Sequence, residues 1–230
     1  MTTLATILDN VLDETGFAKP SSYFGNAAQA AVRARTLANA SIRDLLSLKH
    51  RTLTKEASID LTTAILYDLP ADFFSFVQNT MYEDGETWPA DFPATDQAFA
   101  QLKTSGINDG VLVKIRVIGG QLELFDPLNG GELKFTYRSN HPVQATAAGA
   151  TKELYTADTD VWLLDDRLHA LDIIWRWRKL HGMDYQDDLS IYKRYEKNYL
   201  ARDGGYRSLN MGSGGTTDLV MPQFDPWISP

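Results

Sequence analysis

The sequence of 230 residues contains no cysteine, which excludes disulfides, thiolate metal sites and a cysteine nucleophile. It also lacks any apolar run of about 18 residues, so we expect no membrane-spanning helix. Positive charge is scarce, because 22 Lys and Arg stand against 30 Asp and Glu and the net charge is −8. A nucleic-acid-binding protein needs a basic face, and this balance argues against one. The first residues, MTTLATILDNVLDE, place acids where a secretory signal needs basic residues, which predicts a protein that stays in the cytoplasm of the cell that makes it.

Histidine is scarce as well, and the sequence shows no catalytic constellation. Four histidines occur: His50, His141, His169 and His181. None has the spacing of a zinc site, and His169 is expected on the polar, solvent-facing stripe of a helix. Four acids cluster near the predicted start of that helix: Asp158, Asp160, Asp165 and Asp166. They lack the spacing of a calcium loop and are better explained as residues that precede and cap the helix. We therefore expect no enzymatic activity, no metal and no cofactor.

Two amphipathic helices are expected near the N-terminus. Residues Leu4 to Glu14 place apolar side chains at spacings of three and four, which predicts a helix of about three turns. A longer, alanine-rich helix is expected from about Asn26 to His50. Its small side chains form one stripe that leads on to Ile42 and Leu45: Ala27, Ala31, Ala34 and Ala38. Such a stripe lets a neighbouring helix approach closely, and the alternative is that these alanines reflect helix propensity alone.

Strands are expected from about Ile59 to Pro142. The first alternates from Ile59 to Ile65, a second covers Ser75 to Tyr82, and a third covers Glu132 to Arg138, with a short helix between them from Thr95 to Thr104. The clearest hairpin is Val111 to Phe125. A two-residue turn at Gly119-Gly120 sets three cross-strand pairs: Val117 with Leu122, Ile115 with Leu124, and Arg116 with Glu123. His141 to Lys152 is weakly patterned and is expected to be a surface loop.

Two further helices are expected near the C-terminus, from Asp165 to His181 and from about Asp184 to Arg202. The first is apolar over most of its circumference and should pack on several sides. Its Asp172 and Arg176 have the spacing of a helical ion pair. Five aromatic residues of this hairpin are candidates for either the core or a subunit interface: Trp175, Trp177, Tyr192, Tyr195 and Tyr199. For any one of them, core packing is the stronger interpretation.

The segment after the second helix, 204–230, is rich in glycine but ends in apolar side chains. Glycine disfavours regular structure, whereas a purely solvated tail seldom carries Met, Phe, Trp and Ile close together. We interpret it as an extended arm that docks on a partner, and the alternative is that it folds back on its own domain. Its candidate anchors are Met211, Leu219, Met221, Phe224, Trp227 and Ile228.

The sequence therefore predicts an α+β protein. Residues 1–58 and 155–203 are expected to form an antiparallel-type helical bundle, into which a β-rich domain of residues 59–154 is inserted. Residues 204–230 form the arm. No internal repeat is present.

Several segments together resemble the head-to-tail adaptor proteins of short-tailed bacteriophages, also called head-completion or tail tubular proteins. The segments are Tyr67 to Phe73, the hairpin around Gly119-Gly120, Thr156 to Asp160, Leu163 to Asp188, and Asp203 to Gly205 followed by Ser208 to Met211. The order and spacing of these segments carry the resemblance from about Leu61 to Met211.

This resemblance implies a structural virion protein of the neck, without catalytic activity. It implies a dodecameric ring below the portal protein that extends the DNA channel, with bundles packed subunit to subunit. The arm, 204–230, would bind the portal, and the β-rich part would face a downstream tail protein such as a nozzle or tail tube. DNA would pass through the lumen without specific binding. A negative lumen, which the charge of −8 suggests, would let it slide.

Two other functions fit parts of the sequence. A tail or baseplate accessory, or a receptor-binding module, would use the β-rich part, with Tyr67, Trp88 and Tyr137 exposed. A hydrolase with a carboxylate pair is the third alternative, but no two acids are tied to a cleft by the sequence.

Overall fold

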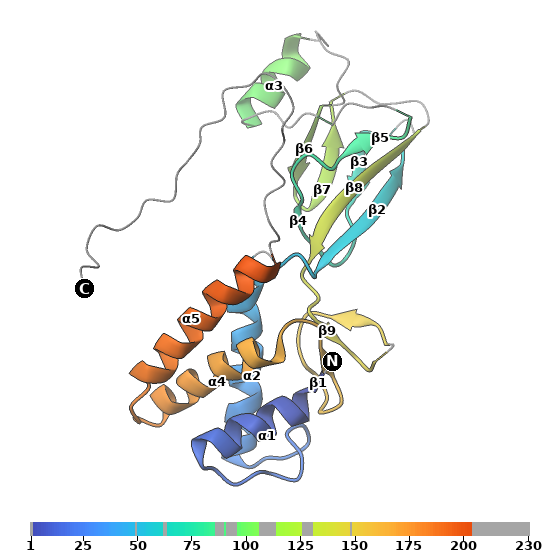
Figure 1. Ribbon diagram of the computed structural model, residues 1–230. Helices are drawn as coiled ribbons and strands as arrows, with labels where there is room; N and C mark the ends of the chain where they lie inside the picture. Colours follow the sequence, from blue (N-terminus) through green and yellow to red (C-terminus); the bar gives the residue numbers. More distant parts are fainter. Residues whose placement is uncertain are drawn as a thin grey trace, which may run out of the picture.

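The computed structural model describes residues 2–48, 50–61, 64–85, 90, 96–105, 114–125, 131–147 and 149–203. Within them the protein is mixed α and β, with five helices and several antiparallel sheets (Figure 1). The helices are α1 (Leu4–Thr15), α2 (Gln29–Leu46), α3 (Asp96–Ser105), α4 (Asp166–Leu180) and α5 (Gln186–Asp203). In the described part of the chain, none of them is long and apolar enough to cross a membrane.

The strands form three antiparallel sheets. One sheet has the order β1 (Thr2–Thr3), β11 (Val161–Trp162), β9 (Val143–Gln144), β10 (Thr151–Lys152). The second has the order β2 (Thr54–Asp60), β8 (Glu132–Ser139), β4 (Phe73–Phe76), and β5 (Tyr82–Glu83) also pairs with β8. The third has the order β3 (Leu66–Asp68), β7 (Gln121–Leu124), β6 (Ile115–Ile118).

The predicted hairpin register is confirmed. Strands β6 and β7 pair Ile115 with Leu124, Arg116 with Glu123, and Val117 with Leu122. The turn has positive φ at both glycines, 59° at Gly119 and 80° at Gly120, a backbone that glycine adopts without strain. The face that carries the Arg116–Glu123 pair is covered by α3, which the sequence did not indicate.

Glu123 shows how α3 is held on that face. Its carboxylate is buried and accepts hydrogen bonds from the Lys103 ammonium of α3 and from Arg116 Nε, the latter at 2.6 Å. Burial alone would raise the pKa of Glu123, but the two cationic donors outweigh it and lower that pKa below its usual value. The Arg116 guanidinium also lies 4.6 Å from the ring centre of Phe99, a buried residue of α3.

Two strand predictions were displaced along the chain. The strand expected from Ile59 begins earlier, as β2 at Thr54, where it pairs with Arg138 of β8. The strand expected from Ser75 to Tyr82 is split into β4 and β5, and between them Asn79 adopts a left-handed φ of 58°. An asparagine at that φ ends a strand locally, so the apolar pattern overestimated its length.

The prediction of a surface loop at 141–152 was wrong. Val143 is fully buried and pairs with both Lys152 and Trp162, so this segment forms part of the sheet that includes the N-terminal strand β1. Strands of two residues carry no periodicity, and this sheet assembles from four segments distant in the sequence. The start of the second helix was also misplaced, because Ala27 is exposed and α2 begins at Gln29.

The apolar side chains form two separate buried clusters. We call the first the helical core; it joins α1, α2, α4 and α5 to the sheet of β1, β9 and β11, and Trp177, Trp162 and Ile42 are among its fully buried members. The second, the β core, includes Leu122, Leu133 and Phe135. Figure 1 shows the two lying at opposite ends of the molecule, with α3 beyond the β sheets.

Candidate functional site

The helical hairpin α4–α5 is closed by the residue that caps its first helix. Asp165 is the N-cap of α4, as the sequence predicted, and its carboxylate accepts the Leu168 N–H at 2.8 Å. The same carboxylate accepts the Tyr195 hydroxyl at 3.1 Å and lies 3.6 Å from the Arg202 guanidinium. Asp165 therefore ties the start of α4 to the C-terminal half of α5.

The neighbouring acids satisfy backbone N–H groups of loops. Asp158 accepts from the Phe24 N–H at 2.9 Å and the Ser22 hydroxyl at 2.8 Å. Asp160 is buried and accepts from the Ala157 N–H at 2.9 Å and from Lys152 Nζ at 2.7 Å. Across the residues that the structure describes, no group of three or more His, Asp or Glu is arranged to hold a metal ion. These carboxylates organise the loops around α1 and α4.

His169 was predicted to be a surface residue, and that prediction was wrong. Its side chain is 0% exposed and lies between Trp162 and Tyr155, with ring centres 4.4 Å and 5.8 Å away. Burial lowers the pKa of His169 to about 4, although its hydrogen bond with the Ala38 carbonyl opposes that shift. The imidazole is thus neutral at pH 7. Because its ring is enclosed by aromatic side chains and backbone, it is not placed to act on a substrate.

Asp172, a second residue of the predicted polar stripe of α4, also points inward, whereas Lys179 near the end of the helix is exposed. Asp172 is 0% exposed and accepts from Trp175 Nε1 at 2.8 Å and from Arg176 Nε at 2.9 Å. The predicted Asp172–Arg176 ion pair is therefore confirmed. Arg176 also reaches Asp44 of α2 at 2.6 Å, so the pair joins two helices. A buried carboxylate needs such partners, which explains why an acid is tolerated on the inner face of α4.

The five candidate aromatic residues occupy different environments. Trp177 is fully buried, with its ring centre 5.3 Å from that of Phe17, and Tyr199 is buried beside His50. Both side chains pack in the helical core. Trp175, Tyr192 and Tyr195 are only partly buried, so these three keep surface that a partner could cover. The candidate anchors of the arm, from Met211 to Ile228, lie outside the described residues.

A contact that the sequence did not indicate joins the end of α5 to the segment just before β2. The Asp203 carboxylate accepts the Arg51 N–H at 2.5 Å and the Thr52 hydroxyl at 2.8 Å, just before β2 begins. Asp203 is also the last residue of α5, directly before the arm. An acid at a helix end carries no signal of so distant a partner, so this link could not have been found from the sequence.

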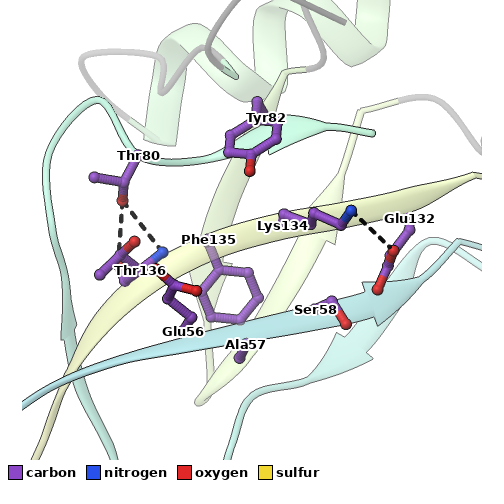
Figure 2. Close-up of a pocket in the computed structure, with 9 residues that line it drawn as sticks. All are labelled: Glu56, Ala57, Ser58, Thr80, Tyr82, Glu132, Lys134, Phe135 and Thr136. Carbon is purple, nitrogen blue, oxygen red and sulfur yellow. Dashed lines mark hydrogen bonds and ion pairs between the residues drawn. The ribbon is translucent and has the colours of Figure 1, made fainter. Parts of the chain in front are cut away.

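A hollow of about 300 Å³ lies on the second sheet (Figure 2). Its Lys134 ammonium is paired with Asp84 at 2.9 Å and Glu132 at 3.5 Å, and the Thr80 hydroxyl accepts the Thr136 N–H at 3.2 Å. The nine residues drawn in Figure 2 include no histidine and no nucleophile held by a base. The hollow therefore has the chemistry of an open sheet surface.

The predicted exposure of Tyr137 on this sheet was wrong. Its ring is buried in the β core, and its hydroxyl donates to Asp72 at 2.8 Å. Burial, together with this contact, raises the pKa of Tyr137 to about 12. Tyr67 is only partly exposed, and Trp88 lies outside the described residues. The aromatic surface expected for a receptor-binding module is thus not formed by Tyr137.

Comparison with known proteins gives a match to a protein family. No curated protein matches the chain. The profile of the family described as SU10 adaptor protein matches residues 2–215, which includes all the helices and strands described above. A match over nearly the whole chain indicates membership of the family, whereas a shared motif would match only a short segment. The chain therefore belongs to the SU10 adaptor protein family, a family of structural adaptor proteins of bacteriophages.

Proposed function

We propose that this protein is a head-to-tail adaptor that forms a ring, a dodecamer by the resemblance noted above, below the portal. The ring extends the DNA channel and joins it to the tail. The observation that carries this proposal is the single continuous family match over residues 2–215, which spans both cores and the beginning of the arm. Membership of an adaptor family points to a structural role in the virion neck, not to catalysis.

We propose the domain organisation that the sequence predicted, with one boundary moved. A helical bundle of residues 1–53 and 155–203 carries an inserted β-rich domain, and the arm is 204–230. The separation of the helical core from the β core supports this division, except that Val143 of the insertion packs in the helical core. Because β2 begins at Thr54, the insertion starts there and not at residue 59.

The arm is proposed to bind the portal through Met211, Leu219, Met221, Phe224, Trp227 and Ile228. Its attachment point supports this role, since the arm follows Asp203, whose carboxylate fixes the end of α5 to the segment just before β2. The partly buried Trp175, Tyr192 and Tyr195 are proposed as contacts between subunits.

The β-rich part is proposed to meet the downstream tail protein. Large apolar side chains that remain exposed on its sheets support this: Ile65, Leu66, Phe74, Tyr82, Val117 and Ile118. Exposed apolar side chains gathered on one part of a monomer are characteristic of an interaction surface. The genome is proposed to pass through the lumen without specific contacts, consistent with the net charge of −8.

Native mass spectrometry of the protein with the portal ring of the same phage tests the ring. We expect addition of about one subunit per portal subunit, the stoichiometry implied by a ring seated on the portal. A discrete monomer or trimer that does not associate with the portal would contradict the adaptor function and favour a receptor-binding or baseplate module.

The arm is tested separately. Truncation after Met211, or Phe224→Ala with Trp227→Ala, should abolish portal binding while the circular dichroism spectrum stays unchanged. Thr216→Ala with Thr217→Ala is the matched control in the same segment and should bind as the wild type does. Full portal binding by the truncated protein would remove the arm from the proposal.

A further inference from the structure

The outward face of α5 is basic, although the chain as a whole is acidic. Lys193, Arg194 and Lys197 are exposed and form no ion pair with another described residue, and the exposed Ile191 lies one turn before Arg194. Lys193 and Lys197 are four residues apart, so they project side by side from the helix. A helix of this kind is often merely solvated, but here the charges are sorted between two faces.

Three of the four carboxylates of α5 turn back toward their own chain, and the fourth, Asp187, is exposed in the first turn of the helix. Asp188 pairs with Arg178 of α4 at 2.9 Å, and Asp203 binds the segment before β2 through Arg51 and Thr52. Glu196 is partly buried on the side of Asp172, and burial followed by that neighbouring charge raises its pKa. The acids of α5 therefore offset its exposed cations only in part, since Glu196 lies near Lys193 but none of the three cations forms an ion pair with a described residue.

A groove of complementary charge lies between α1 and the start of α4. Its volume is about 420 Å³, and its lining residues are Thr2, Thr6, Ile7, Asn10, Asp13, Glu14, Asp166, Arg167 and Ala170. Three of these are carboxylates and one is a guanidinium, while Ile7 and Ala170 supply buried apolar surface. The Asp13 and Glu14 side chains are 59% and 42% exposed.

The acids of the groove have only weak partners within their own chain. Asp13 pairs with Lys19 at 2.6 Å, and Glu14 pairs with Arg167, but all four side chains are at least 42% exposed. Exposed ion pairs of this kind contribute on the order of 0–1 kcal/mol, so they can be exchanged for cations of another molecule at little cost.

The basic face and the acidic groove cannot meet within one subunit. Both α1 and α5 pack against α4, and Figure 1 shows them on opposite sides of it. Two different complementary surfaces on opposite sides of a subunit produce head-to-tail contacts, and such contacts close into a ring when the rotation allows.

We propose that the outer face of α5 in one subunit docks in the α1–α4 groove of the next copy. Lys193 and Lys197 then face Asp13 and Glu14. This inference rests on the proposed ring, and it names the two surfaces that build it. DNA phosphate is the other anion that the basic face could meet, and the experiment below separates the two.

The test uses two charge-reversed full-length variants. One carries Lys193→Glu and Lys197→Glu, and the other carries Asp13→Lys and Glu14→Lys. Each alone places like charges in every contact and should weaken subunit association roughly a hundredfold or more, measured as ring formation on the portal by native mass spectrometry. Mixed in equal amounts, the two variants should assemble in alternation, and a single chain with all four changes should form rings by itself.

Three controls keep the test decisive. Lys193→Arg with Lys197→Arg keeps the charge and should assemble, as should Arg43→Glu, which reverses an exposed cation on α2. Circular dichroism and thermal melting establish that each variant is folded. Wild-type assembly should also weaken as salt rises, because screening shortens the range of exposed charges.

The outcomes separate this inference from the proposed function. Wild-type rings together with unimpaired rings of the Lys193→Glu, Lys197→Glu variant would overturn the α5 contact and leave the adaptor function standing. If that variant assembled normally but its particles ejected DNA abnormally, the basic face would belong to the lumen. If both charge-reversed variants failed to assemble and mixing them did not restore rings, the α5 contact would also be overturned. Absence of any wild-type ring on the portal would overturn both proposals.

Discussion

The helical part and the β-rich part differ in how many apolar side chains they leave exposed. The helical core joins four helices and a small sheet and encloses polar groups such as His169 and Asp172 with their partners. The β core is built from far fewer buried side chains, yet its sheets carry six of the nine large apolar side chains that are exposed in the described residues. Within the described residues, the helical part therefore encloses more of its apolar side chains, and the β-rich part leaves more of them exposed.

The difference also shows how each part uses its charges. In the helical part, buried acids serve hydrogen bonds that fix helices, as Asp172 does for Arg176. In the β-rich part, Asp72 fixes a turn to β8 and β2: it accepts from Lys55 at 2.6 Å, the Ser139 hydroxyl at 2.7 Å and Tyr137. Burial opposes ionisation of Asp72, but these donors outweigh it and lower its pKa to about 2. A small core is thus supplemented by a charged hydrogen-bond network.

The largest expected effect comes from the helical core. Trp177→Ala removes a fully buried ring that packs edge-on against Phe17, and it should lower the free energy of unfolding by roughly 4 kcal/mol. Urea unfolding followed by circular dichroism measures this change, and the loss should include the whole helical signal. Trp175→Ala, at a partly exposed position on another side of α4, should have a smaller effect, although it removes the Nε1 donor to Asp172. Equal losses of unfolding free energy in the two variants would show that the difference in burial between Trp177 and Trp175 does not determine their contributions to stability.

A smaller and more local effect is expected from the β core. Phe135→Ala removes a buried ring whose centre lies 5.3 Å from that of Phe76, and it should cost roughly 3 kcal/mol. Because the two cores are separate, hydrogen exchange should increase in β2 and β8 while α4 stays protected. Increased exchange in α4 to the same degree would show one cooperative unit and remove the contrast between the two parts.

The smallest expected effect is a pH dependence of the free energy of unfolding, which arises from a buried histidine of the helical core. The pKa of His169 is about 4 in the folded protein, below its usual 6.5, so the unfolded chain binds the proton more tightly. Stability should be complete above pH 6.5 and fall by roughly 2 kcal/mol by pH 5. Buried His50, whose pKa is also lowered by burial, adds in the same direction.

Substitution isolates the part due to His169. His169→Gln should flatten the decrease between pH 6.5 and pH 5, measured by urea unfolding at each pH. His141→Gln removes a histidine outside the helical core and is the matched control. An unchanged slope in the His169→Gln protein would assign the pH dependence to other groups.

The sequence predicted elements whose signals are local. The hairpin register followed from Gly119-Gly120 and the alternation around it, and the cap at Asp165 and the ion pair from Asp172 to Arg176 followed from spacing alone. These features depend on a few neighbouring residues, so their physics is contained in short segments. The family resemblance, carried by the order of such segments, was confirmed by the match over residues 2–215.

Tertiary structure decided what lies between distant segments. The sequence predicted that the polar stripe of α4 faces solvent. Instead, α1, α2 and α5 all pack on that helix. His169 and Asp172 are therefore enclosed, and partners from other elements contribute to the network around them. The sheet of β1, β9, β10 and β11 and the contact of Asp203 with Arg51 and Thr52 likewise join residues far apart in the chain. The sequence by itself determined helices, turns and charge. Only the packing of those elements determined which polar groups are inside, because burial depends on neighbours that no local pattern specifies.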